Sequence, residues 1–145
     1  MDIRTGNPSD PFAIPGHPLS ILRQENRAIE TFLGGDFAGH VGRLQEADSP
    51  ELRMLLLEDV RTLMQVGNHY RRIEALMLPI LEAQGHVAAA RVLQAVHRDV
   101  LRMIRDLDDD LRRTDAEAPV LLEFIAFLVR DIEMVIRQER EVYTA

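Results

Sequence analysis

The sequence predicts an all-α fold, an antiparallel up-down-up-down four-helix bundle. Apolar residues recur every three or four positions through most of the 145 residues, which is the spacing of one helix face. Four such stretches follow one another with short connections, and none shows the strict alternation of a β-strand. Amphipathic helices joined by short connections pack as antiparallel neighbours around a shared core, so a bundle follows.

The start of the chain is predicted to be an extended leader over residues 1–16, because prolines and glycines interrupt it. The bundle domain is then expected to span residues 17–145. Its first helix should begin at Pro18, with His17 as the N-cap residue, since proline is tolerated at the first helical position. Two glycines are expected to end this helix, and residues 34–48 are expected to form a loop or a frayed extension that carries His40.

The second helix is expected to begin at Ser49-Pro50-Glu51, which supplies a capping hydroxyl, a proline at the first position and an acid in the first turn. Its apolar face runs to Gln84-Gly85 and includes Pro79. This proline should kink the helix or end it early, because it cannot donate a hydrogen bond to the carbonyl of Ala75.

The third helix is predicted over residues 88–113, with a charged and solvated run at its end. Two starts are open for the fourth helix. One is the capping box Thr114-Asp115-Ala116-Glu117, and the other is Ala118-Pro119. The apolar face of the fourth helix then runs to Val142.

The composition excludes several classes of protein. The chain has no cysteine and no lysine, so disulfide scaffolds, zinc fingers, iron–sulfur proteins, thiol enzymes and Schiff-base lysine enzymes are ruled out. A net charge of −7 argues against binding to nucleic acid or to anionic membranes. No stretch approaches the ~20 apolar residues of a membrane span, and no signal-peptide pattern follows Met1, so we expect a cytoplasmic protein.

Each predicted helix carries an ionisable residue on its apolar face. These residues are Glu25, His69, His97 and Glu139. At ~1.5 Å per residue they lie roughly 9–15 Å from helix ends that are level with one another, and hence in one band across the bundle. An unpaired buried charge is costly, so four in one band indicate a common partner such as a metal ion. Taken singly, each has an ordinary alternative as a hydrogen-bonded core histidine or as an acid paired with arginine.

Several strings of residues resemble the motifs of a known family. They are Gly16-His17-Pro18, Glu25-Asn26-Arg27-Ala28, the run from His69 to Glu82, Val96-His97-Arg98-Asp99 and the run from Val135 to Glu141. Together they resemble the hemerythrin-like HHE cation-binding domains, over residues 14–145. The nearest subgroup is a prokaryotic domain of unassigned function that often stands beside PAS sensor modules.

The resemblance implies a four-helix bundle whose inner side chains bind non-haem iron, usually as a di-iron centre. Functions associated with the family are O₂ carriage, sensing of O₂, NO or redox state, iron handling and repair of iron centres. The metal ligands that the resemblance implies are, strongest first, His69, His97, Glu139, Glu74, Glu25 and His17.

Three positions depart from the family's pattern. Ile73 stands where a ligand four residues after His69 is expected, because the acid Glu74 lies at i+5, about 140° round the helix. Val135 and Asn26 stand where further histidines are common. A full five-histidine site is therefore absent, which leaves a carboxylate-rich di-iron site, a mononuclear site and a metal-free relic as alternatives.

The other histidines are less informative. His17 has two interpretations, as the N-cap residue of the first helix or as a residue lining the mouth of a site near Glu74 and Pro79. A helix N-terminus would favour its neutral form, which suits a metal ligand. His40 and His86 fall in predicted loops and are expected to be solvated.

The leading hypothesis is a hemerythrin-like iron-binding protein that acts as a sensor or gas-binding module rather than as an enzyme, because no nucleophile–base pair is evident. Zinc and manganese suit the same ligands. A metal-free helical domain for docking or dimerisation is the alternative from another class, and a haem-binding bundle using His17 or His69 is a third. The expected partners are a metal ion with O₂ or NO, and either a second copy of the chain or a sensor or signalling protein.

Overall fold

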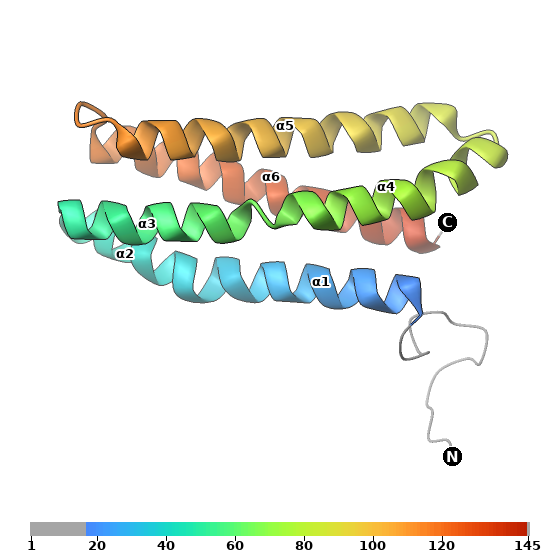
Figure 1. Ribbon diagram of the computed structural model, residues 1–145, viewed down its shortest axis with the longest axis horizontal. Coiled ribbons are helices and arrows are strands. Elements are labelled where there is room, and N and C mark those ends of the chain that lie inside the picture. The colour runs from blue at the N-terminus through green and yellow to red at the C-terminus, as the bar shows by residue number, and fades with distance from the viewer. Residues whose placement is uncertain (1–16, 145) are drawn as a thin grey trace, which may run out of the picture.

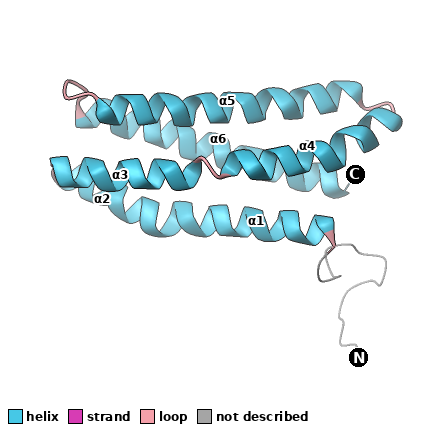
Figure 2. Cartoon of the chain, viewed as in Figure 1, coloured by secondary structure: helices cyan, strands magenta, loops and turns pink. Residues whose placement is uncertain are grey.

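The computed structural model describes residues 17–144, with side chains up to residue 141 (Figure 1). The predicted leader, residues 1–16, lies outside the described residues. Helices make up almost all of the described chain, and no strand occurs in it (Figure 2). The elements in chain order are α1 (Pro18–Phe32), the π-helical turn η2 (Leu33–Phe37), α2 (Ala38–Glu46), α3 (Pro50–Leu63), α4 (Val66–Ala83), α5 (Val87–Arg112) and α6 (Ala118–Thr144).

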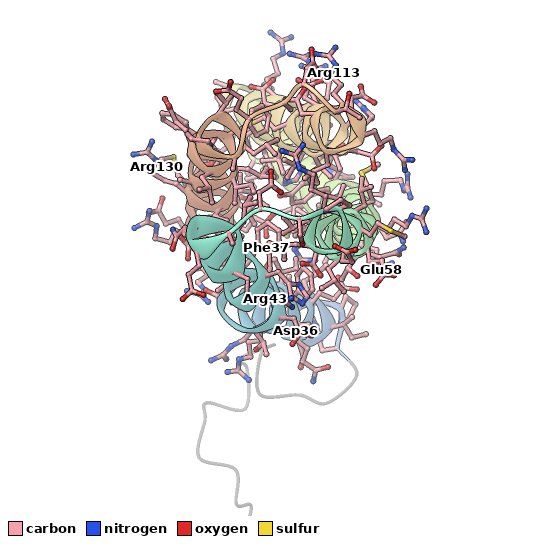
Figure 3. The ribbon with its side chains drawn as sticks, turned by 90° about the vertical axis from the view of Figure 1, so that its left-hand side faces the viewer. Asp36, Phe37, Arg43, Glu58, Arg113 and Arg130 are labelled. Carbon is pink, nitrogen blue, oxygen red and sulfur yellow. The ribbon has the colours of Figure 1, made fainter. Side chains whose placement is uncertain are left out.

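These elements form four antiparallel rods. The first rod contains α1, η2 and α2, the second contains α3 and α4, and α5 and α6 are the third and fourth (Figure 1). Viewed from the end, the rods surround a common core in which Phe37 points inward (Figure 3). The predicted all-α four-helix bundle is confirmed.

The first rod is longer than predicted. The expected loop over residues 34–48 is wrong, because the chain passes through η2 and continues as α2 to Glu46. Phe37 and Leu44, which are 1% and 2% exposed, pack into the core from this segment. The apolar area that they bury outweighs the helix-breaking tendency of two glycines, each worth about 1 kcal/mol relative to alanine.

The second rod is broken near its middle rather than at its proline. α3 ends at Leu63 and α4 begins at Val66, so one predicted helix is two. Pro79 lies inside α4, which continues to Ala83 with its last turns bent toward α5 (Figure 1). Gly85 then ends the rod with a φ of 84°, a left-handed conformation that glycine adopts without strain.

The helix starts follow the capping signals. His17 Nδ1 accepts a hydrogen bond from the Leu19 N–H at 3.2 Å, and Ser49 Oγ accepts from the Leu52 N–H at 3.1 Å. Of the two starts that were open for the fourth helix, the chain uses Ala118.

The core consists of two apolar clusters with a polar layer between them. The larger cluster fills the end of the bundle that holds α2 and α3. The smaller cluster contains Leu22, Ile73, Met77 and Leu93. Buried polar residues separate the two at the same level of all four rods; they are Asn26 on α1, His69 on α4, His97 on α5 and Glu139 on α6.

Candidate metal centre

The polar layer is organised around Glu139. This side chain is completely buried, and each of its carboxylate oxygens meets a different histidine. Oε1 lies 3.0 Å from His69 Nε2, and Oε2 lies 3.1 Å from His97 Nε2. One carboxylate from α6 therefore joins an imidazole on α4 to an imidazole on α5.

A second carboxylate meets each histidine on its other side. Glu25 Oε1 lies 2.8 Å from His69 Nδ1, and Glu74 Oε2 lies 2.8 Å from His97 Nδ1. Both acids are partly exposed, and Glu25 also pairs with Arg72. The five side chains form a continuous chain of contacts, Glu25–His69–Glu139–His97–Glu74, which we call the histidine–glutamate layer.

Helix geometry explains how the layer is assembled. His69 lies four residues before the core residue Ile73, so it points inward. Glu74 lies about 140° round α4 from His69, and it therefore reaches the neighbouring helix and contacts His97. The i+5 spacing that departs from the family's pattern thus gives each histidine a carboxylate of its own.

Electrostatics within the layer favour charged side chains. Burial alone would raise the pKa of Glu139, but the hydrogen bonds and charge of His69 and His97 lower it overall. Burial likewise would lower the pKa of His69, but contacts with Glu139 and Glu25 raise it overall. The pKa of Glu25 is lowered by Arg72 and His69 against the opposing effect of burial. An imidazole donates from both ring nitrogens only when protonated, and His69 has a carboxylate at each of them.

Two further buried residues lie in this region, and neither of them was predicted as a site candidate from the sequence. They are Tyr70 and Asn26. Tyr70 is 2% exposed, and its ring stacks on His97 with centroids 4.0 Å apart and planes 8° apart. The hydroxyl of Tyr70 and both amide atoms of Asn26 are buried and have no hydrogen-bond partner in the structure. Burial and the charge of Glu139 raise the pKa of Tyr70, which keeps its hydroxyl neutral. The inward phase of Asn26 was visible in the sequence, but its lack of partners was not.

Comparison with known proteins identifies the family. The family model described as the Hemerythrin HHE cation binding domain matches residues 17–144. The chain belongs to this family. A search of curated proteins and a search of solved structures gave no match.

The hemerythrin HHE family is one of cation-binding helical domains, and the donors of the layer suit that role in kind. Two imidazoles and three carboxylates are ligands that iron, zinc and manganese accept. The ligand atoms nevertheless pair with one another: within residues 17–141, no three histidine, aspartate or glutamate side chains surround one point as ligands of one ion would. An ion bound here would have to replace hydrogen bonds between His Nε2 atoms and Glu139.

The structure places five of the six candidate ligands in the layer and the sixth elsewhere in the bundle. His17 has the capping role, because its Nδ1 accepts the Leu19 N–H. His86 is exposed in the α4–α5 turn, as expected. The expectation for His40 is wrong, because it lies on α2 and its Nδ1 is 2.6 Å from Oδ2 of the buried Asp59. The helix that continues through residues 38–46 is what brings His40 against α3.

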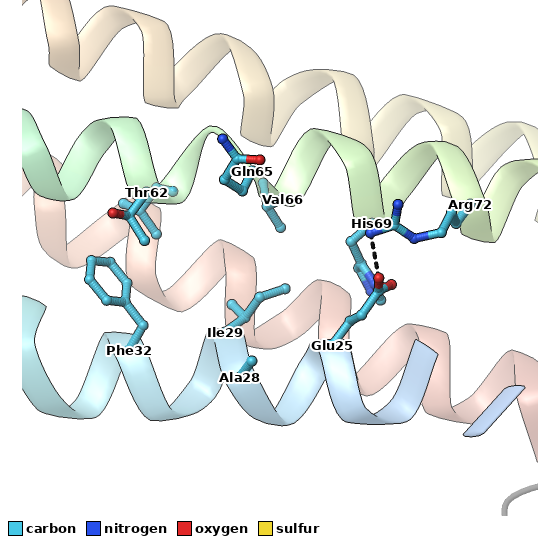
Figure 4. Close-up of a pocket in the computed structure, with 10 residues that line it drawn as sticks. Glu25, Ala28, Ile29, Phe32, Thr62, Gln65, Val66, His69 and Arg72 are labelled. Atoms are coloured by element: carbon cyan, nitrogen blue, oxygen red, sulfur yellow. Dashed lines mark hydrogen bonds and ion pairs between the residues drawn. The ribbon is translucent and has the colours of Figure 1, made fainter. Parts of the chain in front are cut away.

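An apolar pocket leads to one side of the layer. It lies between α1 and the junction of α3 with α4 and has a volume of about 230 Å³. Ile29, Phe32 and Val66 are among its walls, and the Glu25–His69 contact lies at one end of it (Figure 4). The break in the second rod forms part of this wall.

None of the helices in the described part of the chain has both the length and the apolar character that a membrane span requires.

Proposed function

We propose that this chain binds non-haem iron in the histidine–glutamate layer and uses it to sense O₂, NO or redox state, or to handle iron. The observation that carries the proposal is Glu139, which is completely buried and offers one oxygen to each of two imidazoles. A buried carboxylate is costly unless cations or donors surround it. The hydrogen bonds with His69 and His97 meet this need in the present structure, and metal ions would meet it in the loaded protein.

The sharing of Glu139 favours a di-iron centre. Because its two oxygens face different histidines, the carboxylate can serve two ions, one beside His69 and one beside His97. A mononuclear site would need at least three donors to converge on one ion, and no three histidine, aspartate or glutamate side chains of the described residues do so. His69, His97 and Glu139 are therefore the proposed ligands that face the centre.

We assign Glu25 and Glu74 to orientation of the histidines in the first instance. Each meets the Nδ1 atom of a histidine whose Nε2 faces Glu139. A carboxylate at the second nitrogen fixes the tautomer and the ring orientation of a metal-binding histidine and raises its basicity. Both acids are partly exposed, so they are also the nearest further ligands if an ion needs them. His17 is left out of the ligand set because it caps α1.

The surroundings favour a binding module over an enzyme. The pocket that reaches Glu25 and His69 has mostly apolar walls, which suit a small uncharged molecule such as O₂ or NO. Iron would supply the affinity for such a gas, and the protein's residues would hold the iron and exclude bulk water. Zinc or manganese would fit the same donors but would not give the redox response. A cytoplasmic location and a signalling partner remain parts of the proposal.

The metal-free alternative has one observation in its favour. The five side chains of the layer already satisfy one another's charges, so the bundle has no electrostatic need of a metal in order to fold. In that case the protein would be a helical interaction domain. A haem-binding bundle, the third hypothesis, is tested by the same spectra.

Iron analysis of protein purified with iron supplied, together with its visible spectrum, decides among these functions. We expect close to two irons per chain and charge-transfer bands. His69→Ala and His97→Ala should each lose most of the iron and the bands. His40→Ala is the matched control, because it removes a histidine–carboxylate contact outside the layer and should keep both.

Other results of the iron analysis and the spectrum would favour one of the alternative functions. One iron per chain would contradict the di-iron centre but keep the iron site, provided that both layer variants lose it. Sub-stoichiometric iron that neither variant changes would refute the proposal and support the metal-free domain. A Soret band would replace the proposal with haem binding.

A further inference from the structure

The outward face of α6 carries a line of apolar side chains that the metal centre does not use. Val120, Phe127 and Met134 are 61%, 47% and 43% exposed. They follow one another at intervals of seven residues, so their directions drift by only about 20° per step over a length of roughly 21 Å. Single exposed apolar residues are ordinary, but a seven-residue repeat is the pattern by which one helix packs against another.

Charged residues flank this line on one side. Glu123 and Arg130 are exposed and are also seven residues apart, so they share a side of α6. The guanidinium of Arg130 lies 4.8 Å from the centroid of the Phe127 ring, and Figure 3 shows Arg130 at the outer surface of the bundle. The face therefore has an apolar centre with an acid and a base at its edge, which is the composition of a protein interface.

We propose that the chain forms a homodimer in which α6 packs antiparallel against α6 of a second copy. A twofold axis through Phe127 brings residues that lie equally far before and after it to the same height. Val120 then lies opposite the partner's Met134, and Phe127 packs on the partner's Phe127. The short side chain meets the long one, so the line is complementary to itself.

The charges favour the antiparallel direction. The position four residues before Phe127 comes opposite the position four residues after it, so Glu123 lies within one residue of the partner's Arg130. The twofold axis keeps the same side of both helices together, and it creates this ion pair twice. A parallel pair would instead place Arg130 beside the partner's Asp131, which is half-buried against its own chain. Antiparallel helix dipoles also attract each other weakly.

A charge-reversal cycle measured by sedimentation velocity tests the dimer. The wild type should sediment as a dimer at high concentration and dissociate on dilution, and Phe127→Glu should be monomeric throughout. Glu123→Arg and Arg130→Glu should each weaken the dimer at least tenfold, because each places like charges opposite each other. The double variant should recover most of the loss. The two residues are two turns apart within one chain, beyond the i,i+3 and i,i+4 spacings at which helix side chains pair, so recovery points to contact between chains.

Met54→Glu provides the control, because Met54 is 65% exposed but lies on α3. It should leave the dimer unchanged, and all variants should keep the helical circular dichroism and thermal unfolding of the wild type. A wild type that is monomeric at every concentration would overturn the proposal and leave the face to a different protein. A dimer that survives Phe127→Glu, or a double variant no better than the single ones, would overturn it as well. The test is independent of iron content, so it stands or falls apart from the proposed function.

Discussion

Two buried carboxylates in this molecule, Asp59 and Glu139, both contact histidine, but their pKa values are shifted in opposite directions overall. At the first, burial raises the pKa of Asp59, and His40 only partly offsets it while Asp36 and Glu58 add repulsion. At the second, burial acts in the same sense on Glu139, but two imidazoles outweigh it and the pKa is lowered. Glu139 is 0% exposed and Asp59 is 6% exposed, so the pKa of the more deeply buried acid is the one that is lowered. The second imidazole beside Glu139 and the repulsion of Asp59 by Asp36 and Glu58 account for the difference, and the depth of burial does not.

The His40–Asp59 pair and the histidine–glutamate layer also differ in the number of contacts that each histidine makes. The His40–Asp59 pair joins α2 to α3 at the edge of the large apolar cluster, and one nitrogen of His40 is engaged. In the histidine–glutamate layer, both nitrogens of each histidine meet a carboxylate. The layer thus links four helices through four histidine–carboxylate contacts, whereas the His40–Asp59 pair links two helices through one.

The largest effect should come from removing the shared carboxylate. Glu139→Ala leaves two buried histidines facing a cavity, and it should lower the free energy of unfolding of the metal-free protein by about 3–5 kcal/mol. Asp59→Ala removes one contact and should cost no more than about 2 kcal/mol. Urea unfolding followed by circular dichroism measures both. Equal losses would mean that the layer is no more than a second structural pair.

The pH dependence of stability should reflect the lowered pKa of Glu139 and the raised pKa of His69. The pKa of Glu139 is lowered, so its contribution is present above its ordinary value of 4.5 and is lost as the pH falls through the folded value. The pKa of His69 is raised, so its contribution is present below its ordinary value of 6.5 and is lost as the pH rises through the folded value. Unfolding of metal-free protein should therefore show greatest stability between these limits.

A matched variant isolates the acid's share of this profile. Glu139→Gln keeps the size of the side chain but cannot ionise, so the loss of stability on acidification should be smaller in this variant than in the wild type. Identical acid limbs in the two proteins would contradict the assignment. Iron affinity should follow the reverse course, rising with pH, because an imidazole must lose a proton before it can bind a metal.

Much of the layer could be predicted because its residues break local patterns. Glu25, His69, His97 and Glu139 each interrupt an apolar stripe at helical spacing, and counting along the helices brings them to one level. The i+5 offset of Glu74 shows that it leaves the face of His69. Which helix it meets instead depends on packing, and its contact with His97 could not be read from the chain.

The parts that escaped prediction depend on distant contacts. Two glycines favour the end of a helix when only local sequence is considered. In the bundle, Phe37 and Leu44 bury enough apolar surface that the chain stays helical past Gly34 and Gly35. His40 therefore faces Asp59 instead of solvent. No proline marks the break after Leu63. Pro79, which was predicted to kink the helix or to end it early, lies inside α4, and the last turns of α4 bend toward α5.

A smaller effect is expected at the contact with the raised pKa. Because burial makes ionised Asp59 costly, Asp59→Asn removes that cost and keeps a polar atom for His40. At neutral pH the substitution should be neutral or should stabilise the protein, by up to about 1 kcal/mol. The sign follows from the raised pKa, since the wild type regains this stability only as the pH falls through the folded value. A loss above about 2 kcal/mol in thermal or urea unfolding would show that the charge of Asp59 is needed for packing of α2.

The smallest effect should come from a buried polar group beside the layer that has no hydrogen-bond partner among the described residues. The Tyr70 hydroxyl is buried without a hydrogen bond beside His97, and an unsatisfied buried group costs about 1–3 kcal/mol. Tyr70→Phe keeps the stacked ring and removes only the hydroxyl, so metal-free protein should be unchanged or stabilised by up to about 1 kcal/mol. Tyr70→Leu is the contrasting variant, since it loses the ring and should destabilise the protein. Differential scanning calorimetry of both metal-free variants measures the difference. A clear loss of stability in Tyr70→Phe would show that the hydroxyl has a hydrogen-bond partner in solution. Tyr70 would then stabilise the bundle through its polar group, as Glu139 does.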